Sequence, residues 1–317
     1  MRELRDTLLL DRTTGRNIIW ATTTYQKQGL YYEPASEIYP LLMTGDSSQL
    51  VQPRVLRERN DQTQRTREKA EVFTPSWVCN TQNNLVDDAW FGKEGVFNSI
   101  DPEDPQKWIT NKEVISFPKK GLKRWEKYVD APRLEIACGE APYLVSRYDM
   151  VSGEEILIKD RIGILDRKLR VVGENVVSDE EWIRWALRAL QSSYGYEFQG
   201  DNLLLARQNI FTTFLEYYQY KFGQLPEIKV AHEAATIISW NLWQMDGMKY
   251  VVPLSCGAEM VEQISFLDEN NEEIKTCPGC KHKDPMRHTG IYCKIMDWRK
   301  RRSIRFVDLL FADNENN

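Results

Sequence analysis

The apolar residues of this chain recur at two spacings, one typical of helices and one typical of strands. The clearest helix is predicted over 178–190, where Trp, Ala and Leu residues repeat at helical spacing. Ser178 stands three residues before Glu181, which is the arrangement of a capping box at the start of a helix. Two more helices are expected, one from 78 to 90 and one from 201 to about 220.

Short apolar runs predict several strands. One group lies in the middle of the chain, at 155–158, 161–165 and 168–172. The small and β-branched residues of 234–240 predict a central strand, and 194–198 predicts a short strand that presents Glu197 near its carboxyl end. Strands that alternate with helices in this way indicate an α/β fold.

Residues 133–147 combine a strand, a turn of small residues and the expected start of a helix. The turn contains Ala137, Cys138 and Gly139, whose small side chains allow a ligand to approach the backbone closely. Glu135 sets a carboxylate beside that approach. A buried crossover connection without any ligand has the same pattern, so this segment alone leaves both interpretations open.

The composition is that of a globular chain. Of its 317 residues, 42% are hydrophobic, and ten Trp and fourteen Tyr supply large surfaces for burial. The formal net charge is -5, so any binding of nucleic acid has to come from a local basic patch. No apolar run is long enough to span a membrane, and the N-terminus lacks the apolar core of a signal peptide. We therefore expect a cytosolic protein with no membrane partner.

Two segments are locally rich in basic residues. In the first, 52–70, arginines are interleaved with acidic residues, as on a solvated helical face, and the alternative is a basic binding patch. The second is 299–305, which contains Arg299, Lys300, Arg301, Arg302 and Arg305.

Three cysteines and one histidine just before the second basic segment have the spacing of a zinc knuckle: Cys277, Cys280, His288 and Cys293. Thiolate and imidazole ligands suit tetrahedral Zn²⁺, and a Pro-Gly pair between the first two cysteines supplies a tight turn. Four protein ligands close the coordination shell, which indicates a structural ion. Cys256 and His282 are substitute ligands, and a cluster of reduced thiols is the alternative to a metal site.

Together these segments resemble the γ-type adenine-N6 DNA methyltransferases of bacterial restriction-modification systems, proteins described as restriction endonuclease subunit M. In that family a Phe-Thr-Pro segment comes first, and Phe73-Thr74-Pro75 matches it. An Asp-Pro-Ala-Cys-Gly-Ser-Gly-x-Phe motif comes second. Residues 135–143 match its Ala-Cys-Gly centre and keep an acidic first position, while Ala141 stands where the family has glycine.

The later family motifs also have counterparts. A strand that ends in an acidic residue, followed by an Ala-x-x-Asn helix, is matched by Gly195-Tyr196-Glu197 and by Ala206 to Asn209. The catalytic Asn-Pro-Pro-Tyr/Phe motif corresponds in position to 241–244, Asn-Leu-Trp-Gln, which keeps the Asn but lacks both prolines and the final aromatic residue.

The resemblance implies the fold of an S-adenosylmethionine-dependent methyltransferase, an α/β Rossmann-like sheet with helices on both faces, and the spacing of the cysteines adds a small C-terminal zinc knuckle. We therefore expect an N-terminal extension over 1–64, a methyltransferase core over 65–255 with an insertion at about 150–193, and a zinc-knuckle and basic region over 256–317. The implied cofactor-binding residues are Phe73, Thr74, Pro75, Glu135, Ala137, Cys138, Gly139, Pro142, Tyr143 and Glu197. The implied catalytic residues are Asn241, Trp243 and Gln244.

The function implied by the resemblance is transfer of a methyl group from S-adenosylmethionine to adenine N6 of DNA, within a restriction-modification or defence system. Besides DNA, the expected partner is a separate restriction endonuclease or specificity subunit. Two alternatives stay open: a non-catalytic nucleic-acid-binding subunit built on the same fold, with the zinc knuckle and basic patches as its contact surface, and a methyltransferase that acts on a protein glutamine or on RNA.

Overall fold

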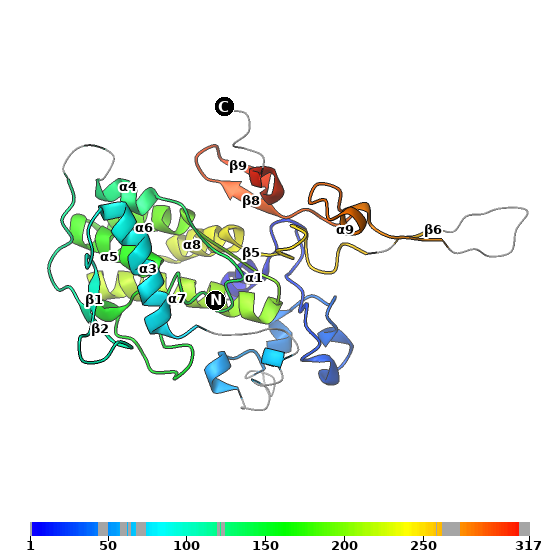
Figure 1. Ribbon diagram of the computed structural model, residues 1–317, viewed down its shortest axis with the longest axis horizontal. Helices are drawn as coiled ribbons and strands as arrows, with labels where there is room; N and C mark the ends of the chain where they lie inside the picture. Colours follow the sequence, from blue (N-terminus) through cyan, green and yellow to red (C-terminus); the bar gives the residue numbers. More distant parts are fainter. Residues whose placement is uncertain are drawn as a thin grey trace, which may run out of the picture.

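The computed structural model describes residues 2–43, 50–57, 62, 65–67, 74–118, 121, 124–257, 259–261 and 273–310. Most of the helices gather at one end of the molecule, and α9 and β6 lie toward the other end, with β8 and β9 between them (Figure 1). Within the described part of the chain, no helix combines the length and the apolar character needed to cross a bilayer.

The described chain mixes helices and short strands. Its α-helices are α1 (Arg2–Leu9), α3 (Ser76–Phe91), α4 (Trp125–Asp130), α5 (Ile164–Asn175), α6 (Asp179–Gln191), α7 (Gly200–Phe222), α8 (Ile228–Asn241) and α9 (Pro278–His282). Its strands are β1 (Asn98–Ile100), β2 (Trp108–Thr110), β3 (Arg133–Glu135), β4 (Ser193–Glu197), β5 (Leu242–Gln244), β6 (Glu259–Val261), β7 (Glu273–Lys275), β8 (Lys294–Asp297) and β9 (Arg302–Arg305).

A three-stranded parallel sheet lies at the centre of the fold, in the order β3-β4-β5. Glu135 of β3 is paired with Gly195, and Glu197 of β4 is paired with Gln244, so the three carboxyl ends share one edge. The other strands form two-stranded antiparallel pairs, β1 with β2, β6 with β7 and β8 with β9. The expected α/β class is therefore confirmed in its coarse form, while the described residues do not form a full Rossmann-like sheet.

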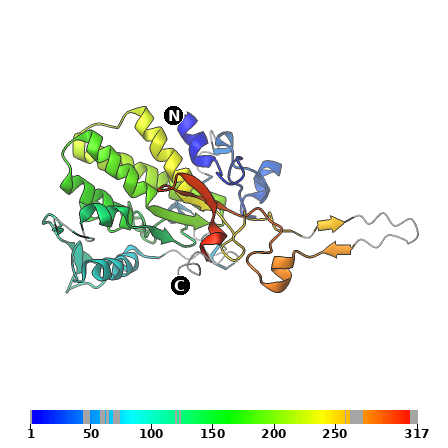
Figure 2. The same ribbon diagram turned by 90° about the horizontal axis from the view of Figure 1, so that it is seen from above.

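The two faces of the sheet are covered by different parts of the chain. Helices α6, α7 and α8 pack on β4 and β5 and enclose the main core. On the opposite face, Trp243 packs with Ile295 and Cys293 in a second, smaller core, and Tyr194 and Tyr196 of β4 border it. In Figure 2, β8 and β9 cross in front of the sheet region on the side away from most helices. Helices on both faces were expected, but among the described residues this second face is covered by the C-terminal region.

Several predicted elements are confirmed. The helices expected over 78–90, 178–190 and 201–220 are α3, α6 and α7, and the strand expected over 194–198 is β4. The Ser178 hydroxyl accepts a hydrogen bond from the Glu181 amide at 3.3 Å, so Ser178 caps α6 as predicted.

The strands predicted between 155 and 172 are wrong, because this segment contains a single helical turn at Ile158–Asp160 and then α5. Leu165, Leu169 and Val172 recur every three or four residues and are buried on one side of α5. Asp166 accepts a hydrogen bond from the Gly163 amide at 3.2 Å and so stabilises the start of the helix. Burial of this helical stripe outweighs the strand propensity of the β-branched residues.

The central strand predicted over 234–240 is also wrong, because these residues belong to α8. Ala231, Ala234, Ala235 and Ile238 lie on one buried side of that helix, and the small alanines allow it to pack closely on α1 and α6. The helix expected after Ala141 is missing as well. There the backbone forms turns instead, and the Tyr143 and Leu144 carbonyls accept hydrogen bonds from Ile164 and Leu165 rather than from a helical turn.

Candidate functional site

The candidate cofactor site is the turn that follows β3. Ala137, Gly139 and Ala141 have φ angles of 47°, 53° and 66°, so three of five successive residues adopt the left-handed conformation. The Cys138 amide donates to the Tyr196 carbonyl at 2.8 Å, which ties the turn to β4. Gly195 lies beneath it, and a Cβ atom there would meet the Cys138 sulfur at 3.3 Å. This tight packing leaves the backbone at Ala137 exposed at the strand ends.

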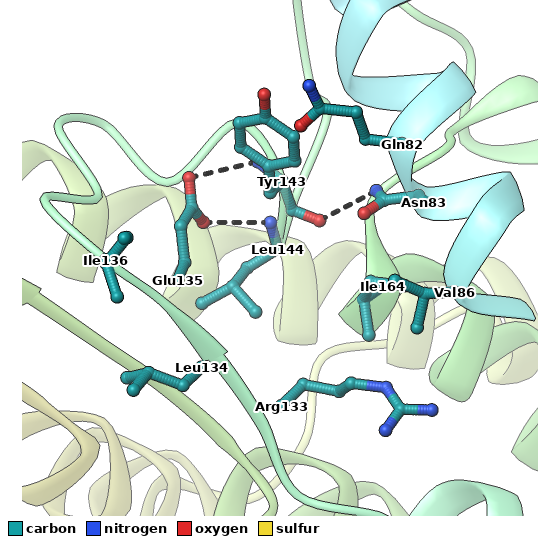
Figure 3. Close-up of a pocket in the computed structure, with 10 residues that line it drawn as sticks. All are labelled: Gln82, Asn83, Val86, Arg133, Leu134, Glu135, Ile136, Tyr143, Leu144 and Ile164. Carbon is teal, nitrogen blue, oxygen red and sulfur yellow. Dashed lines mark hydrogen bonds between the residues drawn. The ribbon is translucent and has the colours of Figure 1, made fainter.

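Two carboxylates lie at the ends of the neighbouring strands β3 and β4. The Glu135 carboxylate accepts hydrogen bonds from the Tyr143 amide at 3.2 Å and from the Leu144 amide at 3.1 Å (Figure 3). The Glu197 carboxylate accepts one from the Gly139 amide at 2.8 Å and also from the Phe198 and Gln199 amides. Burial raises the pKa of both groups, and that of Glu135 reaches about 8.

A cavity of about 400 Å³ lies beside this turn. Figure 3 shows Glu135 and Ile136 on one side of it, with Gln82, Asn83 and Val86 of α3 on the other. Asn83 donates a side-chain hydrogen bond to the Tyr143 carbonyl at 3.0 Å and so fixes the cavity wall. The volume is in the range of small-molecule sites.

The residues expected to bind the cofactor are partly brought together. Thr74 lies beside Tyr143; burial raises the pKa of that phenol, and a hydrogen bond with the Thr74 side chain opposes the rise. Pro75 precedes the first residue of α3. Cys138 and Pro142 are buried within the turn rather than facing a ligand. Phe73 lies outside the described residues.

The sequence did not reveal the roles of three residues of this site. Phe198 follows Glu197 and is 36% exposed, so its ring is available to a planar ligand at the strand end. Glu140 is fully buried, and its carboxylate accepts hydrogen bonds from the Arg54 amide and the Tyr148 hydroxyl. Asn209 of α7 donates to the Glu140 carbonyl at 3.1 Å and thereby supports the turn. Phe198 could have been recognised as an aromatic residue next to the predicted ribose carboxylate.

The three expected catalytic residues do not join this site. Asn241 does not end a strand; it ends α8 at the amino end of β5, opposite the edge that carries Glu135 and Glu197. Its side chain is 1% exposed, donates to the Leu190 carbonyl at 2.8 Å and to the Ser193 carbonyl at 3.1 Å, and accepts from the Trp298 indole at 2.7 Å. This amide therefore has partners inside the protein and no surface for a substrate.

The neighbours of Asn241 are buried in the same way. Trp243 packs against Phe306 with ring centroids 5.0 Å apart. The Gln244 amide donates to the Ile19 and Phe198 carbonyls at 2.8 and 2.9 Å. Gln244 thus holds Phe198 at the strand end and contacts no open surface itself.

A second candidate site lies in the C-terminal region, where four side chains can hold a metal ion such as zinc: Cys256, Cys277, Cys280 and His288. Their ligand atoms all lie within 4.8 Å of one another. The Cys256 sulfur is 3.2 Å from that of Cys277, 3.6 Å from that of Cys280 and 3.5 Å from His288 Nδ1. A tetrahedral ion about 2.3 Å from each sulfur would separate sulfurs by about 3.8 Å. The Cys256–Cys280 separation is close to this value and the Cys256–Cys277 separation is shorter, and three thiols with one imidazole are a donor set that suits zinc.

Cys293 was expected as the fourth ligand, and this assignment is wrong. Its sulfur is fully buried and lies 3.3 Å from the Gln244 carbonyl, in the smaller core. Cys256 takes its place because two glycines allow a close approach. A Cβ on Gly279 would lie 2.6 Å from the backbone nitrogen of His288, and a Cβ on Gly290 would lie 2.9 Å from the Cys256 Cβ.

The thiolate form is favoured at Cys277. Burial opposes this, but N–H groups of Cys280 and Thr289 lower the pKa of Cys277 to about 5. A ligand thiolate that accepts N–H hydrogen bonds is oriented before the ion binds.

No protein-family model matches the chain, and no curated protein or solved structure matches it. A functional interpretation therefore depends on the geometry of the strand-end turn and of the cysteine cluster.

Proposed function

We propose that this chain is an S-adenosylmethionine-dependent methyltransferase acting on adenine N6 of DNA, within a restriction-modification or defence system. The supporting observation is the pair of buried carboxylates, Glu135 and Glu197, at the carboxyl ends of adjacent parallel strands around a turn of left-handed residues. Ligands of α/β sheets bind at this edge. The choice of DNA adenine as acceptor rests on the family resemblance of the sequence.

The residues of the strand ends fit the proposed cofactor. Glu197 Oε1 accepts the Phe198 and Gln199 amides, whereas Oε2 accepts only the Gly139 amide, so Oε2 keeps a lone pair for a hydrogen bond from a ribose hydroxyl. The Phe198 ring stacks on the adenine moiety. Ala137 is exposed and Gly139 is half-buried, and their small size allows close approach, as in the Gly-rich turns of nucleotide-binding folds.

The cofactor supplies a methyl group on a positively charged sulfur, which leaves as a neutral thioether. The chain therefore needs to bind and orient two reactants, and positioning alone can supply much of the acceleration. Asn241 and Trp243 are buried away from the strand-end edge, and Gln244, at that edge, is buried against Phe198, so contact of these residues with the target base is not part of this proposal. A zinc ion held by Cys256, Cys277, Cys280 and His288 would have a structural role, since four protein ligands leave no open coordination position.

A second candidate function is a non-catalytic subunit that binds cofactor and nucleic acid beside a separate specificity or nuclease subunit. The burial of Asn241 supports it, because the side chain expected to hold the target amine has no access to one. The two candidates differ in methyl transfer and not in cofactor binding.

Calorimetric titration with S-adenosylmethionine tests the shared part of both candidates. We expect binding to the native protein and a loss of about 10–100-fold in Glu197→Gln, the usual effect of removing a charge-assisted hydrogen bond. Glu180→Gln, an exposed carboxyl at the start of α6, is the matched control and should bind normally. Absence of binding to the native, folded protein would refute the cofactor site.

Transfer of a labelled methyl group to unmethylated duplex DNA separates the candidates. Label in adenine N6 supports the enzyme. Cofactor binding without label in any DNA, alone or with its partner subunits, supports the second candidate and refutes the first.

A further inference from the structure

Positive charge is segregated toward the C-terminal region. Residues 276–310 contain nine Lys and Arg against three Asp and Glu, although the whole chain has a net charge of -5. A basic face on an acidic protein is the electrostatic footprint of a nucleic-acid surface. The question is which of the basic side chains are available to a ligand.

Two arginines of the first basic segment are internal. Arg65 and Arg57 are buried and form ion pairs with the buried Asp201 of α7, at 2.9 and 3.5 Å. The Tyr25 hydroxyl donates to the same carboxylate at 2.7 Å. These two guanidinium groups compensate a buried charge, so they form neither a solvated helical face nor a binding patch.

The basic side chains of the turn between β8 and β9 are exposed, unlike Arg57 and Arg65. Lys300, Arg301 and Arg302 are exposed, and none of them forms an ion pair with a carboxylate in the part of the chain that the structure describes. Their neighbours are occupied: Arg299 pairs with Asp130 at 2.7 Å, and Arg305 pairs with Asp308 at 2.7 Å. Three adjacent cations thus remain for an external anion.

The turn is also held in one conformation. The Asp297 carboxylate accepts hydrogen bonds from the Arg299 amide at 3.1 Å and the Lys300 amide at 3.0 Å, which fixes the backbone of the turn. Trp298 is anchored to Asn241 by its indole N–H, and Arg301 has a φ of 51°. A turn fixed in this way loses little conformational entropy when it binds.

The zinc knuckle continues this basic surface. Lys281, Lys283 and Arg287 are exposed on or near α9. Tyr292 links the knuckle to β9. Its hydroxyl accepts a hydrogen bond from the His288 amide at 2.8 Å, and its ring lies 5.4 Å from the Arg305 guanidinium.

We infer that the β8–β9 turn, with Lys300, Arg301 and Arg302 at its tip, binds the phosphate backbone of duplex DNA. This inference rests on the proposed function for its choice of partner, and it names the surface that receives DNA. Contacts to phosphates neutralise charge and release counterions, so they position the protein without reading sequence.

Fluorescence anisotropy with a labelled duplex of arbitrary sequence, at several salt concentrations, tests the inference. The triple variant Lys300→Gln, Arg301→Gln, Arg302→Gln should weaken binding about tenfold or more near physiological salt and reduce the slope of log K against log salt by about 2–3. The matched control removes three exposed lysines elsewhere, Lys27→Gln, Lys93→Gln and Lys229→Gln, and should leave the slope unchanged.

Every result of these binding measurements either supports or overturns the inference about the β8–β9 turn. Equal weakening in the two triple variants would mean that only net charge matters and would overturn the inference, as would binding to vesicles containing anionic lipid in place of DNA. Cofactor titration on the same samples distinguishes the two proposals. A triple variant that loses DNA but binds S-adenosylmethionine normally supports the turn, whereas a native protein that binds DNA through the turn but no cofactor refutes only the methyltransferase.

Discussion

The Glu135 and Glu197 carboxyl groups lie at the ends of two hydrogen-bonded parallel strands, and the charge of one affects the protonation of the other. Burial is the main reason that the pKa of Glu135 rises from its ordinary 4.5 to about 8, and the nearby Glu197 adds to it. The Tyr143 and Leu144 amides oppose the rise without cancelling it. The site is thus arranged around a carboxyl that carries a proton at neutral pH.

The raised pKa of Glu135 predicts a specific pH dependence of stability. Between about pH 4.5 and pH 8 the folded state holds a proton that the unfolded state has lost, so this group's contribution is fully present below pH 4.5 and decreases as pH rises through 8. The decrease can reach about 1.4 kcal/mol per pH unit. Glu135→Gln should remove it. Denaturant unfolding of the native protein and of Glu135→Gln at pH 5 and pH 8 measures the effect. If the free energy of unfolding changed equally with pH in both proteins, the assignment would be contradicted.

Strain in the β3 turn leads to a second prediction. Ala141 is fully buried with a φ of 66°, a conformation that costs a non-glycine residue about 1–2 kcal/mol. Ala141→Gly should stabilise the protein despite the added freedom of the unfolded chain. Ala131→Gly, at a φ of -66°, is the control and should destabilise by about 0.4–1 kcal/mol. Thermal unfolding compares the two, and a lower midpoint for Ala141→Gly would argue against strain.

The metal site predicts opposite results for two cysteine variants. Cys256→Ser should reduce zinc affinity by more than about 100-fold, since residues that only orient a ligand already contribute about 10–100-fold. Cys293→Ser should keep its zinc, because that sulfur faces the Gln244 carbonyl in the core. Zinc content after dialysis against a weak chelator gives the answer. The reverse result would restore Cys293 as the ligand.

Gly279 provides an independent check on the same site. A Cβ there would lie 2.6 to 2.7 Å from the His288 backbone and ring, so Gly279→Ala should displace the histidine and weaken zinc binding. Gly257→Ala is the matched control, because it adjoins Cys256 but its Cβ would meet nothing within 4 Å. A chelator titration monitored by release of zinc compares them. Equal zinc retention would show that His288 is not held at Gly279.

Helices α3, α6 and α7 and three of the four knuckle ligands were predictable from sequence because their signals are local. The spacing of apolar residues in α6 and the Ser178 cap lie within one segment, and so does the spacing of Cys277, Cys280 and His288. The turn after β3 was recognised from its small residues for the same reason.

The errors came from residues whose role depends on distant parts of the chain. The small and β-branched run in α8 suits either a strand or a helix, and only packing on α1 and α6 decides. Cys256 reaches the knuckle because Gly290 lets the two segments approach. Arg57 and Arg65 looked like surface charges, yet Asp201, far along the sequence, draws them inside.

Asn241 gives the last prediction, because its buried amide holds three groups together. Asn241→Ala would leave the Leu190 and Ser193 carbonyls and the Trp298 indole without their partner, which should cost about 2–4 kcal/mol of the free energy of unfolding. Trp298→Phe removes only one of these bonds and should cost less. The double variant should cost less than the sum of the two, because both changes remove the same hydrogen bond. Denaturant unfolding of the four proteins measures this coupling. An Asn241→Ala protein as stable as the native one, but unable to transfer methyl groups, would instead place this residue in the active site.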